Sequence, residues 1–267
     1  MAAEFLRRGL RDHRRALLAW CVGIAGYIGL VSAIFPSIHN SPALDKLVEN
    51  YPDVLKQFFG LGQGGGINTG SGYLDIELFS LMLPLLILVL AIGAGARTLA
   101  GEEDAGRLEL VLAYPVRRSG AVVAKAAAVA AEIVMACIAA GIALAVLDPL
   151  VGLDLRFEKL LGALVMLAAL GLLHGWLALS VGAAVSSRTL AIGIPAGLAA
   201  TGYLVNGLHG VAGWLDPFRF VSPFWLVGTS PLRQGVQGWG LAAVLIASVT
   251  VLAAGAILFE RRDLQTP

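Results

Sequence analysis

Charged residues are scarce in this chain of 267 residues, and so are cysteine, histidine and the aromatic residues. Charged side chains make up 14% of the sequence and hydrophobic residues 58%, and the mean hydropathy is +0.81. A soluble domain of this length could not hide so much apolar surface in its core. The composition therefore excludes a water-soluble protein and predicts that the chain lies in a lipid bilayer.

Several motifs that would carry catalysis are also missing. The sequence has no Gly-x4-Gly-Lys-Ser/Thr loop, no Leu-Ser-Gly-Gly-Gln segment and no His-Glu-x-x-His motif. The glycine-rich stretch 60–72 contains no lysine that could bind a phosphate. Cys21 and Cys137 fall in apolar runs, where we expect small packing residues rather than a disulfide. We expect no enzyme activity, no metal and no cofactor in this chain, and no nucleic acid among its partners.

Six continuous apolar runs reach the roughly 20 residues that a membrane-spanning helix needs. They cover residues 16–35, 78–96, 119–147, 160–185, 190–208 and 239–259. The first run has no small-residue cleavage site behind it, so we expect it to be retained as a helix. The runs predict an all-α polytopic membrane protein with six transmembrane helices, forming a single transmembrane domain over residues 1–267.

The distribution of Lys and Arg predicts the orientation of these helices. Thirteen of the 19 basic residues fall at the N-terminus, in the second and fourth connections or at the C-terminus. Because cytoplasmic loops carry the positive excess, both termini and residues 97–118 are expected inside, with the outer loop 36–77 on the other side.

Two flanking segments suit the membrane surface. Residues 1–15 place leucines at helical spacing among arginines, which favours an interfacial helix, although a simple basic anchor is the alternative. Its basic residues are Arg7, Arg8, Arg11 and Arg14. Residues 209–238 are rich in aromatic residues and proline, so we expect a re-entrant or interfacial outer segment there.

The inner connection carries a short amphipathic pattern. Glu102 and Glu103 favour the positive end of a helix that starts near Gly101. Pro115 ends this helix, because the residue before proline resists the α conformation. Apolar residues share one helical face: Leu108, Val111 and Leu112. A plain interfacial helix explains this pattern as well as a docking element does.

The same residues carry a family resemblance. The stretch Gly101-Glu-Glu-Asp-Ala-Gly-Arg-Leu-Glu-Leu-Val-Leu-Ala-Tyr-Pro-Val-Arg-Arg118, followed by Lys125, is similar to the inner-loop signature of permeases in the second class of ATP-binding-cassette (ABC) exporters. The segments Ser41–Leu47, Tyr51–Asp53 and Phe259–Leu264 also resemble this family. Tyr114 and Val111 depart mildly from the usual pattern.

The resemblance implies a function and a set of partners. The inner-loop helix would be a coupling helix on a separate ATPase subunit, which would bind ATP and Mg²⁺. Its coupling surface would contain Glu102, Glu103, Leu108, Val111, Leu112 and Pro115. Two permease chains, identical or homologous, would pair along helices one and five, where small residues favour close packing: Gly23, Gly26, Gly193 and Gly197.

Two polar residues fall within predicted spans. Glu132 lies near mid-bilayer if the third helix starts at the membrane surface, which would suggest a functional charge. If that helix starts outside the bilayer, Glu132 lies nearer the interface and is paired or protonated. His174 has no second metal ligand at a suitable spacing, so we expect it to bond to a neighbour.

The leading hypothesis is the permease subunit of an ABC exporter in a bacterial or archaeal-type plasma membrane. It would move a lipophilic or amphipathic small molecule outward by alternating access. The alternative is an ion- or proton-coupled secondary transporter that uses Glu132. An intramembrane protease is disfavoured because no activated nucleophile can be assembled.

Overall fold

The computed structural model describes residues 2–39, 50, 52, 69–104, 118–210, 212–228 and 230–262, with side chains from Arg14 onward except that of Asp104. Every regular element in these ranges is helical. Six helical stretches are long and apolar enough to cross a membrane. The chain is an all-α polytopic membrane protein.

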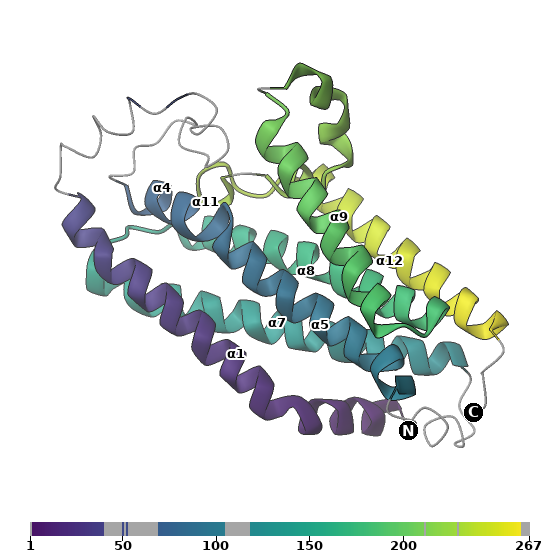
Figure 1. The fold of residues 1–267 in the computed structure, drawn as a ribbon. Coiled ribbons are helices and arrows are strands. Elements are labelled where there is room, and N and C mark those ends of the chain that lie inside the picture. The colour runs from purple at the N-terminus through teal and green to yellow at the C-terminus, as the bar shows by residue number, and fades with distance from the viewer. Residues whose placement is uncertain are drawn as a thin grey trace.

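Six long helices form a bundle (Figure 1). They are α1 (Ala2–His39), α5 (Met82–Asp104), α7 (Arg118–Val151), α8 (Phe157–Val185), α9 (Arg188–Leu208) and α12 (Gly238–Arg261). Both chain termini lie at one end of the bundle, which we call the terminal end. The opposite end is the distal end.

Shorter helices gather at the distal end (Figure 1). The helix α4 (Gly70–Leu74) and the π-helix η1 (Asp75–Phe79) precede α5. The 3₁₀-helix η2 (Gly213–Val221), α10 (Pro223–Val227) and α11 (Pro231–Gln234) connect α9 to α12. The second span therefore consists of α4, η1 and α5, with a turn at residues 80–81.

The helices differ from the sequence expectations mainly at their ends. The predicted helix start near Gly101 was wrong, because residues 101–104 continue α5, and the rest of that predicted helix lies outside the described residues. The expected N-terminal interfacial helix and the first span form one helix, α1, which bends close to its N-terminal end (Figure 1). The broken segment expected over residues 209–238 contains the three short helices η2, α10 and α11.

The centre of the bundle is formed by α5 and α8, which belong to the two spans with the largest share of buried residues. A Cβ added at Gly95 would lie 2.1 Å from the carbonyl oxygen of Gly175, so the two backbones approach too closely for any side chain there. Large apolar side chains from α5 and α7, including Leu83, Ile87 and Ile133, are fully buried in the same core. Small residues thus allow the close packing that holds helices together in lipid.

The other long helices cover this centre. The helix α1 packs on α7, α12 packs on α8, and α9 packs on α8 and α5. Their outward faces expose large apolar side chains, such as Val22 and Ile246 at 70% and 67% exposure. Such surface is expected where lipid, rather than water, surrounds the protein.

Candidate functional site

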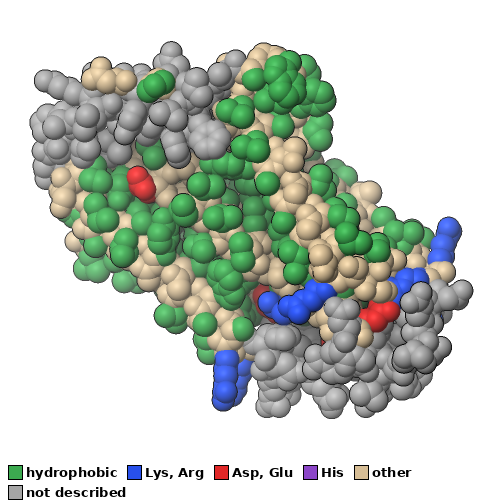
Figure 2. Space-filling model, in the orientation of Figure 1, with side chains coloured by type: hydrophobic (Ala, Val, Ile, Leu, Met, Phe, Trp, Pro, Cys, Tyr) green, Lys and Arg blue, Asp and Glu red, His purple; other side chains and the backbone are tan. Residues whose placement is uncertain are grey.

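Charged side chains gather at the terminal end of the bundle, where Figure 2 shows blue and red side chains together. We call this group the terminal cluster. It comprises Arg97, Glu102, Glu103, Arg118, Lys125, Glu132 and Arg262. These residues come from α5, α7 and the residue that follows α12.

The first tie of the terminal cluster joins α5 to α7. Glu102, in the last turn of α5, forms an ion pair with Lys125, which lies two turns into α7. Both side chains are about four-fifths buried. An ion pair that is shielded from water in this way is screened less by salt than an exposed pair.

The second tie joins α5 to α8 and α12. Glu103 accepts hydrogen bonds from the guanidinium of Arg262 and from Ser186 Oγ, the latter at 2.9 Å. Arg262 Nη1 also donates to the carbonyl oxygen of Ala183 at 2.9 Å. Ser186 caps the C-terminal end of α8 with a left-handed backbone conformation. One arginine therefore connects the ends of three helices.

The third tie joins the residue after α12 to the start of α7. Arg118 Nη1 donates to the backbone carbonyl oxygen of Arg262 at 2.7 Å. Residues 105–117 connect Asp104 to Arg118, so both flanks of this segment lie within the terminal cluster. Any force on the segment acts directly on the ends of α5 and α7.

Glu132 lies deeper in the bundle and pairs with Arg97 of α5 at 3.1 Å. Its side chain is 9% exposed and that of Arg97 is 32% exposed. The 34 residues of α7 give a helix of about 51 Å at 1.5 Å per residue, well beyond a bilayer core of about 30 Å. The ion pair with Arg97 agrees with the pairing in the second expectation for Glu132.

A second buried ion pair lies at the distal end. Arg233 Nε donates to Asp75 Oδ2 at 3.1 Å, and the backbone N–H of Leu232 donates to Asp75 Oδ1 at 3.1 Å. The Asp75 side chain is 1% exposed. Arg233 also donates to Ser230 Oγ at 2.8 Å. These bonds fasten α11 to η1, the start of the second span.

His174 is buried among apolar neighbours. Its Nδ1 lies 2.9 Å from the carbonyl oxygen of Leu170, one turn earlier in α8. Its ring lies 6.4 Å from the ring of Phe224. No group of three or more metal-ligating side chains occurs in the described part of the chain. His174 therefore serves packing and hydrogen bonding within α8.

The glycines of the long helices fall into two groups, and all four that were expected at a helix pairing surface belong to the first. A Cβ added at Gly23, Gly26, Gly193 or Gly197 would meet no atom within 4 Å. By contrast, Gly175 packs against α5 and α7 inside the chain. The glycines of the first group form open strips on the surfaces of α1 and α9. An apolar groove of about 470 Å³ lies beside one of these strips, between α1 and α5.

A family model of known proteins matches residues 9–260, which include five of the six spans in full and all but the last residue of the sixth. Its description is "Multidrug efflux system permease Rv1217c, C-terminal domain". The chain belongs to this family of efflux-permease domains. No curated protein matches the sequence. The match supports a permease role in drug efflux.

Several residues predicted for this efflux-permease domain lie outside the described residues. They are Leu108, Val111, Leu112 and Pro115 of the coupling surface. Likewise, the side chains of Arg7, Arg8 and Arg11 are not described, whereas Arg14 is exposed. Of the expected coupling surface, the structure describes Glu102 and Glu103, and it places both acids in ion pairs with the permease's own helices.

The partners of these acids were not predicted. Arg97 entered the sequence argument only as an inner-side positive charge, and Lys125 and Arg262 only as parts of family-like segments. Their roles depend on contacts between residues 23 to 159 positions apart. A usable signal did exist, because charges inside or beside an apolar span are costly and usually pair.

Proposed function

We propose that this efflux-permease domain is the membrane half of an exporter driven by a separate ABC ATPase subunit. It would move lipophilic or amphipathic small molecules outward by alternating access. The ATPase subunit would bind ATP and Mg²⁺, and a second permease chain, identical or homologous, would complete the pathway. Both termini would lie in the cytoplasm, and the terminal cluster would face the ATPase from the inner side of a plasma membrane.

The observation that carries this proposal is that the terminal cluster contains the residues on both flanks of residues 105–117. That segment contains the pattern that resembles a coupling helix. Its flanks are joined by Glu102 to Lys125 and by Glu103 to Arg262. A displacement of the segment by an ATPase would therefore pass to α5, α7, α8 and α12 together. Packed helices with discrete ion pairs move as units, which suits a switch between two states.

The alternative function is ion- or proton-coupled transport through Glu132, and it requires different surroundings for this carboxylate. A proton carrier must exchange its proton with an aqueous path. Glu132 is instead buried and paired with Arg97 at 3.1 Å. This arrangement favours a structural role for the pair. If Glu132 nevertheless carried protons, Glu132→Gln would abolish transport, whereas charges introduced at Leu108 and Leu112 would have no effect.

The first experiment asks whether an ATPase accompanies the permease. The tagged chain is purified in mild detergent from its native membrane, and co-eluting proteins are identified by mass spectrometry. We expect a P-loop ATPase at near one-to-one stoichiometry. A folded permease without such a partner would overturn the ABC proposal and favour ion-coupled transport.

The second experiment tests the coupling surface in the assembled complex. We expect Leu108→Glu with Leu112→Glu to abolish ATP-dependent export of a fluorescent dye from vesicles, because an apolar docking face would become charged. ATP hydrolysis by the ATPase subunit should persist. As a matched control, Val249→Glu with Ile246→Glu places two charges on the exposed face of α12, and it distinguishes loss of coupling from loss of membrane insertion. Export that persists in the Leu108/Leu112 variant would refute the docking role.

A further inference from the structure

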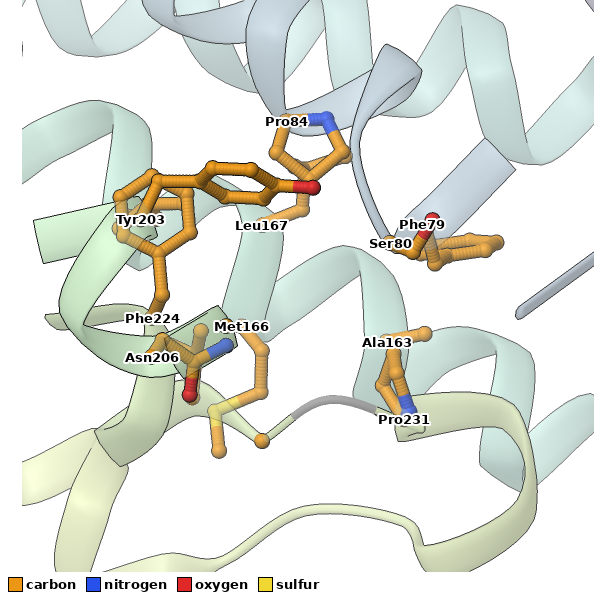
Figure 3. A pocket seen from close by; sticks show the side chains of 14 residues that line it. Phe79, Ser80, Pro84, Ala163, Met166, Leu167, Tyr203, Asn206, Phe224 and Pro231 are labelled. Atoms are coloured by element: carbon orange, nitrogen blue, oxygen red, sulfur yellow. The ribbon is translucent and has the colours of Figure 1, made fainter. Parts of the chain in front are cut away.

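A cavity at the distal end lies where the second span, α8, α9 and the segment before α12 meet. Its free volume is about 50 Å³. Figure 3 shows Phe79, Ser80 and Pro84 on one side, and Tyr203, Asn206 and Phe224 on the other. Met166 and Leu167 of α8 line it between them. We call it the distal cavity.

The lining of the distal cavity is mostly apolar, and its polar side chains are Ser80, Tyr203 and Asn206. No acidic or basic side chain lines it within the described residues. Asn206 Oδ1 is buried and has no hydrogen-bond partner there. An amide taken from water without a partner is costly. Such an unpaired group suggests that a ligand or water supplies the missing hydrogen bond.

The backbone beside the distal cavity is irregular. The π-helix η1 ends at Phe79, and a turn at residues 80–81 separates it from α5. Phe79 and Ser80 both line the cavity. Irregular backbone within a membrane span is tolerated where it lines a cavity, and π-helical turns are frequent at functional sites. This is a second observation, independent of Asn206, that points to a binding site.

One wall of the distal cavity belongs to the segment between α9 and α12. Phe224 and Val227 of α10 and Pro231 of α11 form this wall. The Asp75–Arg233 pair fastens α11 to η1, and Ser222 Oγ donates to the carbonyl oxygen of Gly202 at 2.7 Å. The cavity therefore lies between the second span and the distal segment, at the end of the bundle remote from the terminal cluster.

We infer that the distal cavity is a recognition subsite for the compounds that this permease moves, and that it takes the neutral amide end of an amphipathic molecule. The inference rests on the proposed export function. An amide offers one N–H donor and one C=O acceptor, which complement the acceptor and the donor of Asn206. The terminal torsion of an asparagine is broad, so both atoms of its amide can reach such a group. A volume of about 50 Å³ holds the amide end alone, while the apolar remainder stays outside the mouth.

The test uses a matched pair of compounds. The first, 2-quinolone, has adjacent N–H and C=O groups and no charge, and 1-methyl-2-quinolone lacks the N–H. Equilibrium binding of the tritiated compounds to the full chain in lipid nanodiscs is measured against empty nanodiscs. We expect 2-quinolone to bind about tenfold more tightly, as the loss of one hydrogen bond predicts. Asn206→Leu should bind both compounds equally. The control Thr201→Val, at an exposed position of α9, should keep the preference.

Three outcomes would overturn the inference: no saturable binding of either compound, equal binding by the unchanged chain, or a preference that survives in Asn206→Leu. The binding assay needs no ATPase, so it is separable from the proposed function. Export driven by a co-purified ATPase, without any preference for the N–H compound, would refute only the subsite. A preference that depends on Asn206, in a chain that never associates with an ATPase, would refute only the ABC proposal.

Discussion

Asp75 and Arg233 show how a single ion pair can hold the distal end together. The carboxylate is almost fully buried and receives bonds from Arg233 Nε and from the backbone of Leu232. Burying two charges is expensive, and their attraction repays that cost only when the geometry is good and the remaining polar atoms are bonded. Here both carboxylate oxygens have a partner. The pair therefore fixes where α11 lies on the second span.

We expect Asp75→Ala to destabilise the chain strongly, because Arg233 would remain buried without its counter-ion. Loss of one partner of a buried pair costs about 3–5 kcal/mol. The double variant Asp75→Leu with Arg233→Met should recover a large part of this loss. Thermal unfolding in detergent, followed by intrinsic fluorescence, measures both. A double variant no more stable than Asp75→Ala would show that the charges do not act as a pair.

At the residue scale, the sequence predicted which residues are polar within spans but not their partners. Glu132 was recognised as an unusual intramembrane charge, and the alternative of a paired carboxylate proved to describe it. Arg97, however, is 35 residues away in the sequence, on another helix. Periodicity locates a side chain on its own helix. It cannot show which neighbouring helix lies opposite.

Two glycines, Gly95 and Gly175, allow the close approach of α5 and α8. A Cβ at Gly95 would lie 2.1 Å from the carbonyl oxygen of Gly175 and 2.9 Å from Cβ of Ala178. Backbone atoms cannot move aside as the end of a flexible side chain can. The sequence argument did not single out Gly95. A chain rich in glycine contains many pairs of glycines at helical spacing by chance. Only the structure distinguishes the tight contact at Gly95 and Gly175 from the open strips on α1 and α9.

We expect Gly95→Ala to separate α5 from α8 and to lower stability. Overpacking typically costs about 1–3 kcal/mol, which corresponds to roughly 2–12 °C in Tm for a chain of this size. Gly238→Ala is the matched control, since a Cβ there meets no atom within 4 Å. Differential scanning fluorimetry of both variants gives the comparison. Equal melting temperatures would contradict the close contact.

The open glycine strips lead to the opposite expectation. Gly193→Leu with Gly197→Leu adds side chains on α9 where no atom lies within 4 Å, so the melting temperature of the isolated chain should not fall. If α9 belongs to the surface between two permease chains, the added bulk should prevent their pairing. Native mass spectrometry of the complex then shows the loss of the two-permease species. A complex that still contains two permeases would exclude this strip from the pairing surface.

At the scale of the whole molecule, the six helices and their apolar outer faces followed from hydropathy and length alone. The exact residues at which helices begin and end did not follow from them. Gly101, Glu102 and Glu103 were expected to begin a new helix because acids favour a helix N-terminus. They instead lie within α5, where Glu102 pairs with Lys125 and Glu103 pairs with Arg262.

These ion pairs give the last prediction, which concerns communication across the whole molecule. We expect Glu102→Gln with Glu103→Gln to reduce ATP-dependent export about tenfold or more while the ATPase subunit continues to hydrolyse ATP. The reason is that residues 105–117 would lose their charged ties to α7 and α12, so motion of the segment would no longer reach those helices. Dye export and phosphate release are measured in the same vesicles.

The control for this variant is Glu158→Gln, which removes a charge from the exposed pair with Arg156 at the other end of the bundle. An exposed pair contributes little, so export should be unchanged. The reversed pair Glu103→Arg with Arg262→Glu should restore part of the export lost in Glu103→Arg alone, because the attraction between α5 and the end of α12 returns with the opposite polarity. Full export in the Glu102/Glu103 variant, at an unchanged melting temperature, would show that the terminal cluster does not transmit the motion.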